Sequence, residues 1–155
     1  MFFLVKRGIL CYDFYKERRK IMTDYELAQK AVKALENSYS PYSGFRVGAA
    51  LLAADGRVFV GCNIENASYP AGICAERTAI GNAVSSGARE FLKIAIAGGK
   101  NGEITDYCPP CGICRQVLSE FCGEDFEILL YNGENIKNYR LSELLPFGFG
   151  REELC

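Results

Sequence analysis

The sequence predicts an α/β fold, a three-layer α-β-α sandwich in which a mixed sheet of about five strands is covered by helices on both faces. The chain has 155 residues, 49% of them hydrophobic, which is enough for one full core and too little for two ordinary domains. Segments with helical spacing of apolar residues alternate with short apolar runs. Their order is α, β, β, α, β, α, β, followed by one further strand and helix, and this order favours a mixed sheet between two layers of helices.

The first half of the chain predicts one helix and a hairpin. Apolar residues recur at helical spacing within residues 24–37, with Thr23 or Asp24 as the N-cap. Pro41 and Gly44 end this helix in a loop over residues 38–44. Two apolar runs, residues 46–53 and 57–64, follow and are joined by Ala54-Asp55-Gly56. An Asp-Gly pair between two such runs is typical of a β-hairpin.

The second half predicts alternating helices and strands. A helix from about Cys74 to Ser85 ends at Gly87, and a buried strand follows over residues 92–99. A second helix, residues 111–123, is closed by Gly123, and another strand covers residues 126–132. Residues 139–149 predict a short helix that continues into a Phe-rich tail.

The first 21 residues differ from the rest in charge. They hold six basic and two acidic side chains, a net charge of +4, and the remainder carries −5. Lys6 and Arg7 interrupt the apolar run after Val5, so no signal peptide is indicated, and no transmembrane span is present. We expect residues 1–22 to be an N-terminal extension, mobile or non-native, and residues 23–155 to form a single domain.

Charge also limits the partners. A net charge of −1 at pH 7 supplies no long-range attraction toward phosphate backbones, so nucleic acid is a poor candidate. Nothing in the sequence suggests export or a membrane, and we therefore expect a cytoplasmic protein.

Five of the eight cysteines fall within 49 positions, which favours reduced thiols or metal ligands over disulfides. Cys111 and Cys114 lie three apart at the start of a helix and share one face, and Cys74 begins another helix. Helix N-termini stabilise thiolates, so these three sulfurs are suited to bind one metal ion. Glu76 lies close to this site without being a ligand, where a carboxylate can accept a proton from water.

Two alternatives compete with a catalytic zinc site, and a third is excluded. Cys108 has ligand spacing to Cys111, so a closed structural site with four sulfurs is one of them. A thiol-disulfide oxidoreductase centre using Cys108 and Cys111 is another. An iron-sulfur cluster is excluded, because Leu118 and Ser119 stand where its motif needs Cys and Pro.

Two segments carry a family resemblance: Cys74-Ala75-Glu76-Arg77, and Pro110-Cys111-Gly112-Ile113-Cys114-Arg115-Gln116. With them the sequence resembles the zinc-dependent cytidine deaminases that act on the free nucleoside and bind zinc with three cysteines. The chain contains no histidine, the residue that other deaminases generally use at the first ligand position. The resemblance runs from about Thr23 to Leu154 and includes FRVGAAL (45–51), GCNIENASY (61–69) and LLPFGF (144–149).

The resemblance implies roles for particular residues. One zinc per chain is bound by Cys74, Cys111 and Cys114, and Glu76 is the proton shuttle. The substrate contacts are Phe45 against the pyrimidine, Asn63 and Glu65 at the ribose hydroxyls, Tyr69, the backbone of Ala75, and Phe149 from a neighbouring subunit, with Phe147 as its alternative. Asn63 can donate and accept while Glu65 only accepts, which suits a sugar diol. Arg77 hydrogen-bonds ligand sulfurs and offsets their charge, whereas Arg115 is expected to be solvated.

The implied function is hydrolytic deamination of cytidine and deoxycytidine to uridine and deoxyuridine with release of ammonia, a step of pyrimidine salvage. The family resemblance further implies a homotetramer whose active sites are shared between subunits. A blasticidin S-type deaminase has the same cysteine pattern and stays open as an alternative. The function of Cys108 is also left open.

Overall fold

The computed structural model describes residues 22–150 and 153–154. The helices are α2 (Asp24–Leu35), α3 (Ala75–Ser85), α4 (Gly112–Phe121) and α5 (Leu141–Leu144), with a short 3₁₀ helix η1 (Tyr69–Ala71). The strands are β1 (Phe45–Ala53), β2 (Val58–Cys62), β3 (Phe91–Lys100), β4 (Glu127–Tyr131) and β5 (Ile136–Arg140). Residues 1–21 of the predicted extension lie outside the described residues, so the domain boundary near residue 22 stays a prediction.

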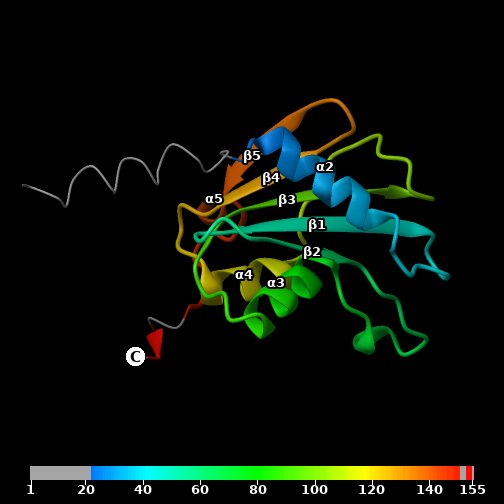
Figure 1. The fold of residues 1–155 in the computed structure, drawn as a ribbon. Coiled ribbons are helices and arrows are strands. Elements are labelled where there is room, and N and C mark those ends of the chain that lie inside the picture. The colour runs from blue at the N-terminus through cyan, green and yellow to red at the C-terminus, as the bar shows by residue number, and fades with distance from the viewer. Residues whose placement is uncertain (1–21, 151–152, 155) are drawn as a thin grey trace, which may run out of the picture.

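The five strands form one mixed sheet in the order β2-β1-β3-β4-β5. β3 and β4 are parallel and the other neighbouring strands are antiparallel. Helix α2 covers one face of the sheet, and α3 and α4 cover the other (Figure 1). The predicted three-layer α/β architecture is confirmed.

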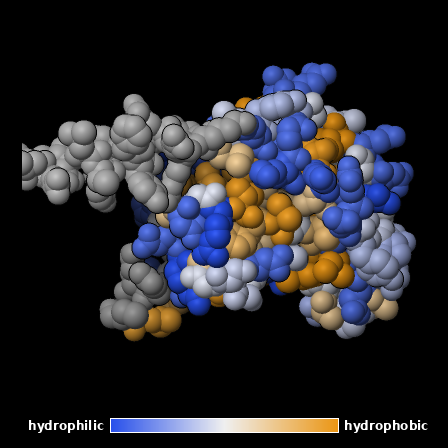
Figure 2. All heavy atoms as spheres, in the orientation of Figure 1, coloured by the Kyte–Doolittle hydropathy of each residue, from blue (hydrophilic) through white to orange (hydrophobic). Residues whose placement is uncertain are grey.

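Each face of the sheet has its own apolar core. Leu27, Ala28 and Ala31 of α2 pack with side chains of β1, β3 and β4 on one face. Residues of α3 and α4 pack on the opposite face with Ala49, Leu51, Ile94, Ile96, Ile128 and Leu130. In Figure 2 the hydrophobic residues gather in the middle of the visible face, with more hydrophilic residues around them. The alternation of side chains along each strand supplies both cores.

Local sequence explains where the first elements begin and how closely they pack. Thr23 caps α2 in a capping box with Glu26, as one of the two predicted N-caps. A Cβ on Gly48 of β1 would lie 2.0 Å from the carbonyl oxygen of Ala31. A Cβ on Gly61 of β2 would lie 2.4 Å from the carbonyl oxygen of Ala75. Both glycines therefore allow a helix backbone to contact the sheet directly, and Gly61 does so at the first turn of α3.

The prediction for residues 139–149 was partly wrong. Tyr139 and Arg140 belong to β5, and the helix begins only at Leu141. β5 is an edge strand with three exposed and two half-buried residues, so its sequence lacks the continuous apolar run of β3 or β4. Among the described residues, no helix combines the length and apolar character that crossing a membrane requires.

The topology brings the starts of α3 and α4 to one edge of the sheet. β2 and β3 both run antiparallel to β1, so their carboxyl ends lie at the same edge. Helix α3 connects β2 to β3, and α4 connects β3 to β4, so both helices begin at that edge. The first residue of β1, Phe45, pairs there with Lys100 at the end of β3. Sheets of this kind assemble their sites at the carboxyl ends of strands.

Candidate metal centre and active site

Three sulfurs converge where α3 and α4 begin. Cys74 and Cys111 are the N-cap residues of these two helices, and Cys114 follows within the first turn of α4. The Sγ atoms of Cys74 and Cys111 are 3.8 Å apart, and those of Cys111 and Cys114 are 3.5 Å apart. All three lie within 4.8 Å of one another, and the described part of the chain holds no other group of three or more such ligand side chains.

The sulfur set fits a zinc ion. Thiolates bind Zn²⁺ strongly, and three protein ligands leave one coordination position for water or substrate. Neither N-cap cysteine uses its side chain for a capping hydrogen bond, so both sulfurs are available as ligands. Cys114 is buried, Cys74 is half-buried and Cys111 is exposed, so the group is open on one side. Cys74, Cys111 and Cys114 would therefore hold the metal.

The three sulfurs differ in how readily each loses its proton. Hydrogen bonding from Cys114 lowers the pKa of Cys74 to about 5, against the effect of burial, and Arg77 lowers it further. The same hydrogen bond and burial raise the pKa of Cys114. Hydrogen bonding between neighbouring sulfurs thus favours the thiolate at Cys74 over that at Cys114.

Glu76 is the one buried charged side chain among the described residues, with 4% of its surface exposed. It lies in the first turn of α3, two residues after Cys74. Burial is the main reason that the pKa of Glu76 is raised to about 7; a backbone hydrogen bond opposes this rise, and the negative charge of Cys74 adds to it. A carboxyl group that exchanges its proton near neutral pH is suited to general acid-base chemistry.

Arg77 lies beside the sulfurs. Burial opposes its charge, but hydrogen bonding and attraction to Cys74 hold the pKa of Arg77 above its ordinary value, and Cys114 adds to this. One guanidinium nitrogen, Nη2, donates to the carbonyl oxygen of Gly72 at 3.2 Å. The buried Nε has no hydrogen-bond partner. A cation held in this place offsets part of the negative charge of three thiolates.

Cys108 stands outside the sulfur group. Its Sγ lies against Gly98 of β3, where an added Cβ would be only 2.9 Å away. Burial raises the pKa of the Cys108 thiol to about 11, and the charges of Glu76 and Cys74 raise it further. A reactive redox cysteine needs a lowered pKa, so Cys108 does not favour the oxidoreductase alternative.

The side chain of Asn63 makes more hydrogen bonds within the protein than the sequence indicated. Its Oδ1 accepts from the backbone N–H of Val47 at 2.8 Å and from the Ser38 hydroxyl. Its Nδ2 donates to the carbonyl oxygen of Phe45 at 2.9 Å. An amide oxygen has two lone pairs, so only one N–H is left for a ligand. The expectation that Asn63 both donates and accepts toward a sugar is therefore corrected to donation alone.

Glu65 is held by the loop between α2 and β1. Its Oε2 accepts from the backbone N–H groups of Tyr42 and Ser43 at 2.9 and 3.2 Å, and its Oε1 accepts from the Ser43 hydroxyl. The hydroxyl and the two N–H groups, together with the charge of Lys100, hold the pKa of Glu65 below its ordinary value. The sequence pattern indicated only the end of a helix in this loop and did not indicate that Tyr42 and Ser43 donate hydrogen bonds to Glu65.

The other predicted substrate residues differ in their surroundings. Ala75 is buried at the first position of α3, where a helix leaves its backbone N–H groups without intrahelical partners. Phe45 is partly exposed. Tyr69 is exposed, and its ring contacts that of Tyr42, with centroids 6.4 Å apart. Phe149 is 60% exposed. The structure thus places Ala75 beside the sulfurs and leaves the rings of Tyr69 and Phe149 at the surface.

Arg115 is not solvated as expected. Its Nε donates to the carbonyl oxygen of Pro110 and its Nη1 to that of Leu144, both at 2.8 Å. The next residue, Gln116, donates from Nε2 to the carbonyl oxygen of Phe149 at 2.7 Å. The sequence pattern did not indicate this hydrogen bond of Gln116, because the bond joins positions 33 apart in the chain.

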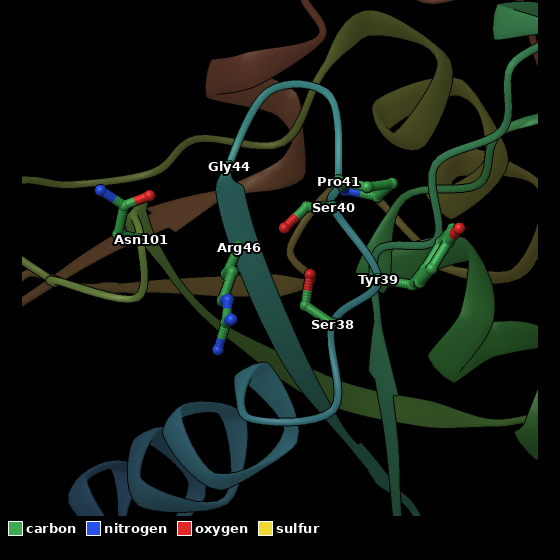
Figure 3. A pocket seen from close by; sticks show the side chains of 7 residues that line it. All are labelled: Ser38, Tyr39, Ser40, Pro41, Gly44, Arg46 and Asn101. Carbon is green, nitrogen blue, oxygen red and sulfur yellow. The ribbon is translucent and has the colours of Figure 1, made fainter.

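A pocket of about 350 Å³ lies on the face of the sheet that α2 covers. It is lined by Ser38, Tyr39, Ser40, Pro41, Gly44, Arg46 and Asn101 (Figure 3). Arg46 follows Phe45 on β1, so the two side chains leave opposite faces of the strand. A Cβ on Gly102 would contact both Arg46 and Leu35 of α2, which places Arg46 on the α2 face. The pocket is therefore separate from the sulfur group, which belongs to the face covered by α3 and α4.

The meeting of three thiols beside a buried carboxyl group favours metal-assisted hydrolytic chemistry on this α/β fold. Comparison with known proteins specifies the class. Residues 22–129 match the family model described as the cytidine and deoxycytidylate deaminase zinc-binding region. The chain belongs to the cytidine deaminase family.

Individual relatives support this assignment. A cytidine deaminase from Halalkalibacterium halodurans is 46% identical over 129 residues, covering 83% of this chain and 95% of the relative. The solved structure of a cytidine deaminase from Burkholderia pseudomallei is 44% identical, with a TM-score of 0.77, covering 83% of this chain and all of that one. A blasticidin-S deaminase from Bacillus cereus is 30% identical over 132 residues, covering 83% of this chain and 93% of the relative.

Proposed function

We propose that the protein catalyses the zinc-dependent hydrolytic deamination of cytidine and deoxycytidine, which yields uridine or deoxyuridine and ammonia. The observation that carries the proposal is the convergence of three cysteine sulfurs beside the buried carboxyl group of Glu76. Relatives named as cytidine deaminases at 44% and 46% identity support this substrate over blasticidin S, for which the relative is 30% identical. The raised pKa of Cys108 argues against the oxidoreductase alternative.

The proposed chemistry divides between the metal and the protein. One zinc per chain, held by Cys74, Cys111 and Cys114, would act as a Lewis acid that makes water a better nucleophile near neutral pH. Glu76 accepts the proton of the attacking water and delivers it to the ring nitrogen beside C4. The water oxygen is now bonded to C4; Glu76 carries the remaining proton of that oxygen to the amino group, and the bond between C4 and the amino nitrogen breaks to release ammonia. Burial of Glu76 excludes bulk water that would otherwise exchange these protons.

The remaining site residues are proposed to bind the nucleoside. The ring of Phe45 packs against the pyrimidine, the free N–H of Asn63 donates to a ribose hydroxyl, and Glu65 accepts from one. Glu65 is ready for this role because the loop holds it ionised and in place. Arg77 offsets the charge of the thiolates, which would otherwise make the metal a weaker Lewis acid.

The assembly and setting are proposed on the family resemblance. We propose a homotetramer in which Phe149, or Phe147, of one subunit and Tyr69 complete a shared site. Exposed rings at all three positions are consistent with contacts to another subunit. Pyrimidine salvage in the cytoplasm is the corresponding setting.

The test is a substrate comparison on the purified protein. Ammonia release is measured with cytidine, deoxycytidine and blasticidin S, before and after removal of the metal by a chelator and again after zinc is restored. We expect turnover of both nucleosides that is lost with the metal and recovered with zinc. Turnover of blasticidin S alone, or turnover that persists without metal, would reject the proposal.

A further inference from the structure

Two consecutive side chains of α4 hold the segment that follows α5. This C-terminal segment, residues 144–149, begins at Leu144 and ends at Phe149. Arg115 donates to the carbonyl oxygen of Leu144, and Gln116 donates to that of Phe149. The same Arg115 also donates to the carbonyl oxygen of Pro110, the residue before Cys111. The first turn of α4 therefore binds the loop that carries one sulfur and both ends of the C-terminal segment.

The backbone between these two ends adopts an unusual conformation. Phe147 has a φ of 55°, in the left-handed region that non-glycine residues seldom occupy. Such a conformation persists only where the surrounding structure holds it. The ring of Phe147 is fully exposed, so packing of this ring does not hold it. The contacts on either side of it are the Gln116 hydrogen bond to the Phe149 carbonyl oxygen and the packing of Gly148 against Leu145, whose Cδ2 would lie 2.8 Å from a Cβ there.

The backbone that carries the two exposed aromatic rings of Phe147 and Phe149 is therefore held against the start of α4. Leu145 packs against the apolar core on the α3 and α4 face. Cys111 caps α4, and Cys114 lies directly before Arg115 on it. Because residues 111–116 carry two sulfurs and both donors, the hydrogen bonds hold the backbone at Leu144 and Phe149, at the two ends of the segment, against the start of α4.

Resting on the proposed function, we propose that Arg115 and Gln116 are positioning residues that set substrate affinity through the aromatic rings of the C-terminal segment. Neither is placed to transfer a proton, because their donor groups are directed to backbone carbonyl oxygens. They therefore affect how the nucleoside is bound and leave the proton transfers of Glu76 unchanged. Gln116 gives the cleaner test, since loss of Arg115 would also release the loop before Cys111.

The test variant is Gln116→Glu, which keeps the shape of the side chain and replaces the N–H donor by a carboxylate facing the Phe149 carbonyl oxygen. We expect KM for cytidine to rise about three- to tenfold, the range that one hydrogen bond supplies. We expect kcat to change less than twofold and zinc content to stay unchanged. Glu120→Gln, an exposed position on the same helix, is the matched control and should leave KM unchanged.

A double-mutant comparison separates positioning from a general structural effect. If Gln116 acts through a ring, Gln116→Glu has no further effect on KM once that ring is removed by Phe149→Ala or Phe147→Ala. The ring-deletion variant, Phe149→Ala or Phe147→Ala, in which Gln116→Glu no longer changes KM identifies the ring through which Gln116 acts. Additive effects in both backgrounds, or a fall in kcat without a change in KM, would overturn the proposal.

Hydrogen exchange supplies a readout that does not depend on turnover. In Gln116→Glu the amides of residues 145 and 147–150 should exchange faster, while those of α4 and β3 exchange as in the wild type. Unchanged exchange in residues 145–150 would show that Gln116 does not hold the segment and would also overturn the proposal. A wild-type protein that fails to deaminate cytidine would refute the proposed function instead, and the exchange comparison would then decide whether Gln116 positions the segment.

Discussion

The substitution Glu76→Gln tests the proposed proton shuttle most directly. Glutamine has the shape of the carboxylic acid but neither accepts nor releases a proton, so the position is filled while the chemistry is removed. Positioned general acids and bases contribute about 10²- to 10⁴-fold in rate. Glu76 is proposed to serve two transfers and is only 4% exposed, so bulk water cannot replace it. We therefore expect kcat to fall about 10⁴-fold, close to 5.4 kcal/mol at 1.36 kcal/mol for each tenfold.

Stability and metal content should be retained in this variant. Burial raises the pKa of Glu76 to about 7, so the charged form is disfavoured and a neutral amide is tolerated at this position. We expect one zinc per chain and a melting temperature no lower than that of the wild type. Glu120→Gln makes the same chemical change at an exposed site and should keep full activity.

The assay is ammonia release from cytidine together with metal analysis of the same sample. Turnover within tenfold of the wild type at full zinc content would refute the assignment of Glu76 as the proton shuttle. Loss of zinc in Glu76→Gln would point to a ligand role for Glu76 and would contradict the three-sulfur site.

Three further predictions concern neighbouring features. Cys108→Ser should leave zinc content unchanged by metal analysis, because Cys108 lies outside the sulfur group; metal loss would restore the closed four-sulfur site. Ser43→Ala removes a hydroxyl donor from Glu65 and should raise KM for cytidine several-fold at constant kcat, and an unchanged KM would argue against ribose binding there. Gly48→Ala should lower the free energy of unfolding by at least about 1–3 kcal/mol in denaturant titration, since its Cβ would overlap the backbone of α2; wild-type stability would contradict the close contact.

Sequence patterns predicted the elements whose signals are local. Thr23 was one of the two predicted N-caps of α2, and it forms a capping box with Glu26. The Asp55-Gly56 pair predicted the hairpin of β1 and β2. Both features could be predicted because they depend on residues only a few positions apart. β5 was the weakest prediction, because an edge strand is exposed along much of its length and its residues are largely polar. The helix predicted from residue 139 consequently began too early.

The residues that support the site were harder to predict than the residues that form it. The hydrogen bonds of Arg115 and Gln116 reach carbonyl oxygens 29 and 33 positions away, and no spacing rule applies to such contacts. The partners of Glu65 lie 22 and 23 positions before it in a loop without regular structure. Asn63 was assigned two functions toward a ligand because its internal hydrogen bonds could not be seen.

By itself the sequence determined which residue types were available: three cysteines at helix starts, a glutamate two positions after the first, and no histidine. Only the tertiary structure decided that Cys74 meets Cys111 and Cys114, that Cys108 stays apart, and that Glu76 is buried. The physical reason is that helix starts follow from short-range hydrogen bonding and side-chain spacing. Their meeting at one edge of the sheet depends on how β2 and β3 pair with β1, and therefore on contacts between distant parts of the chain.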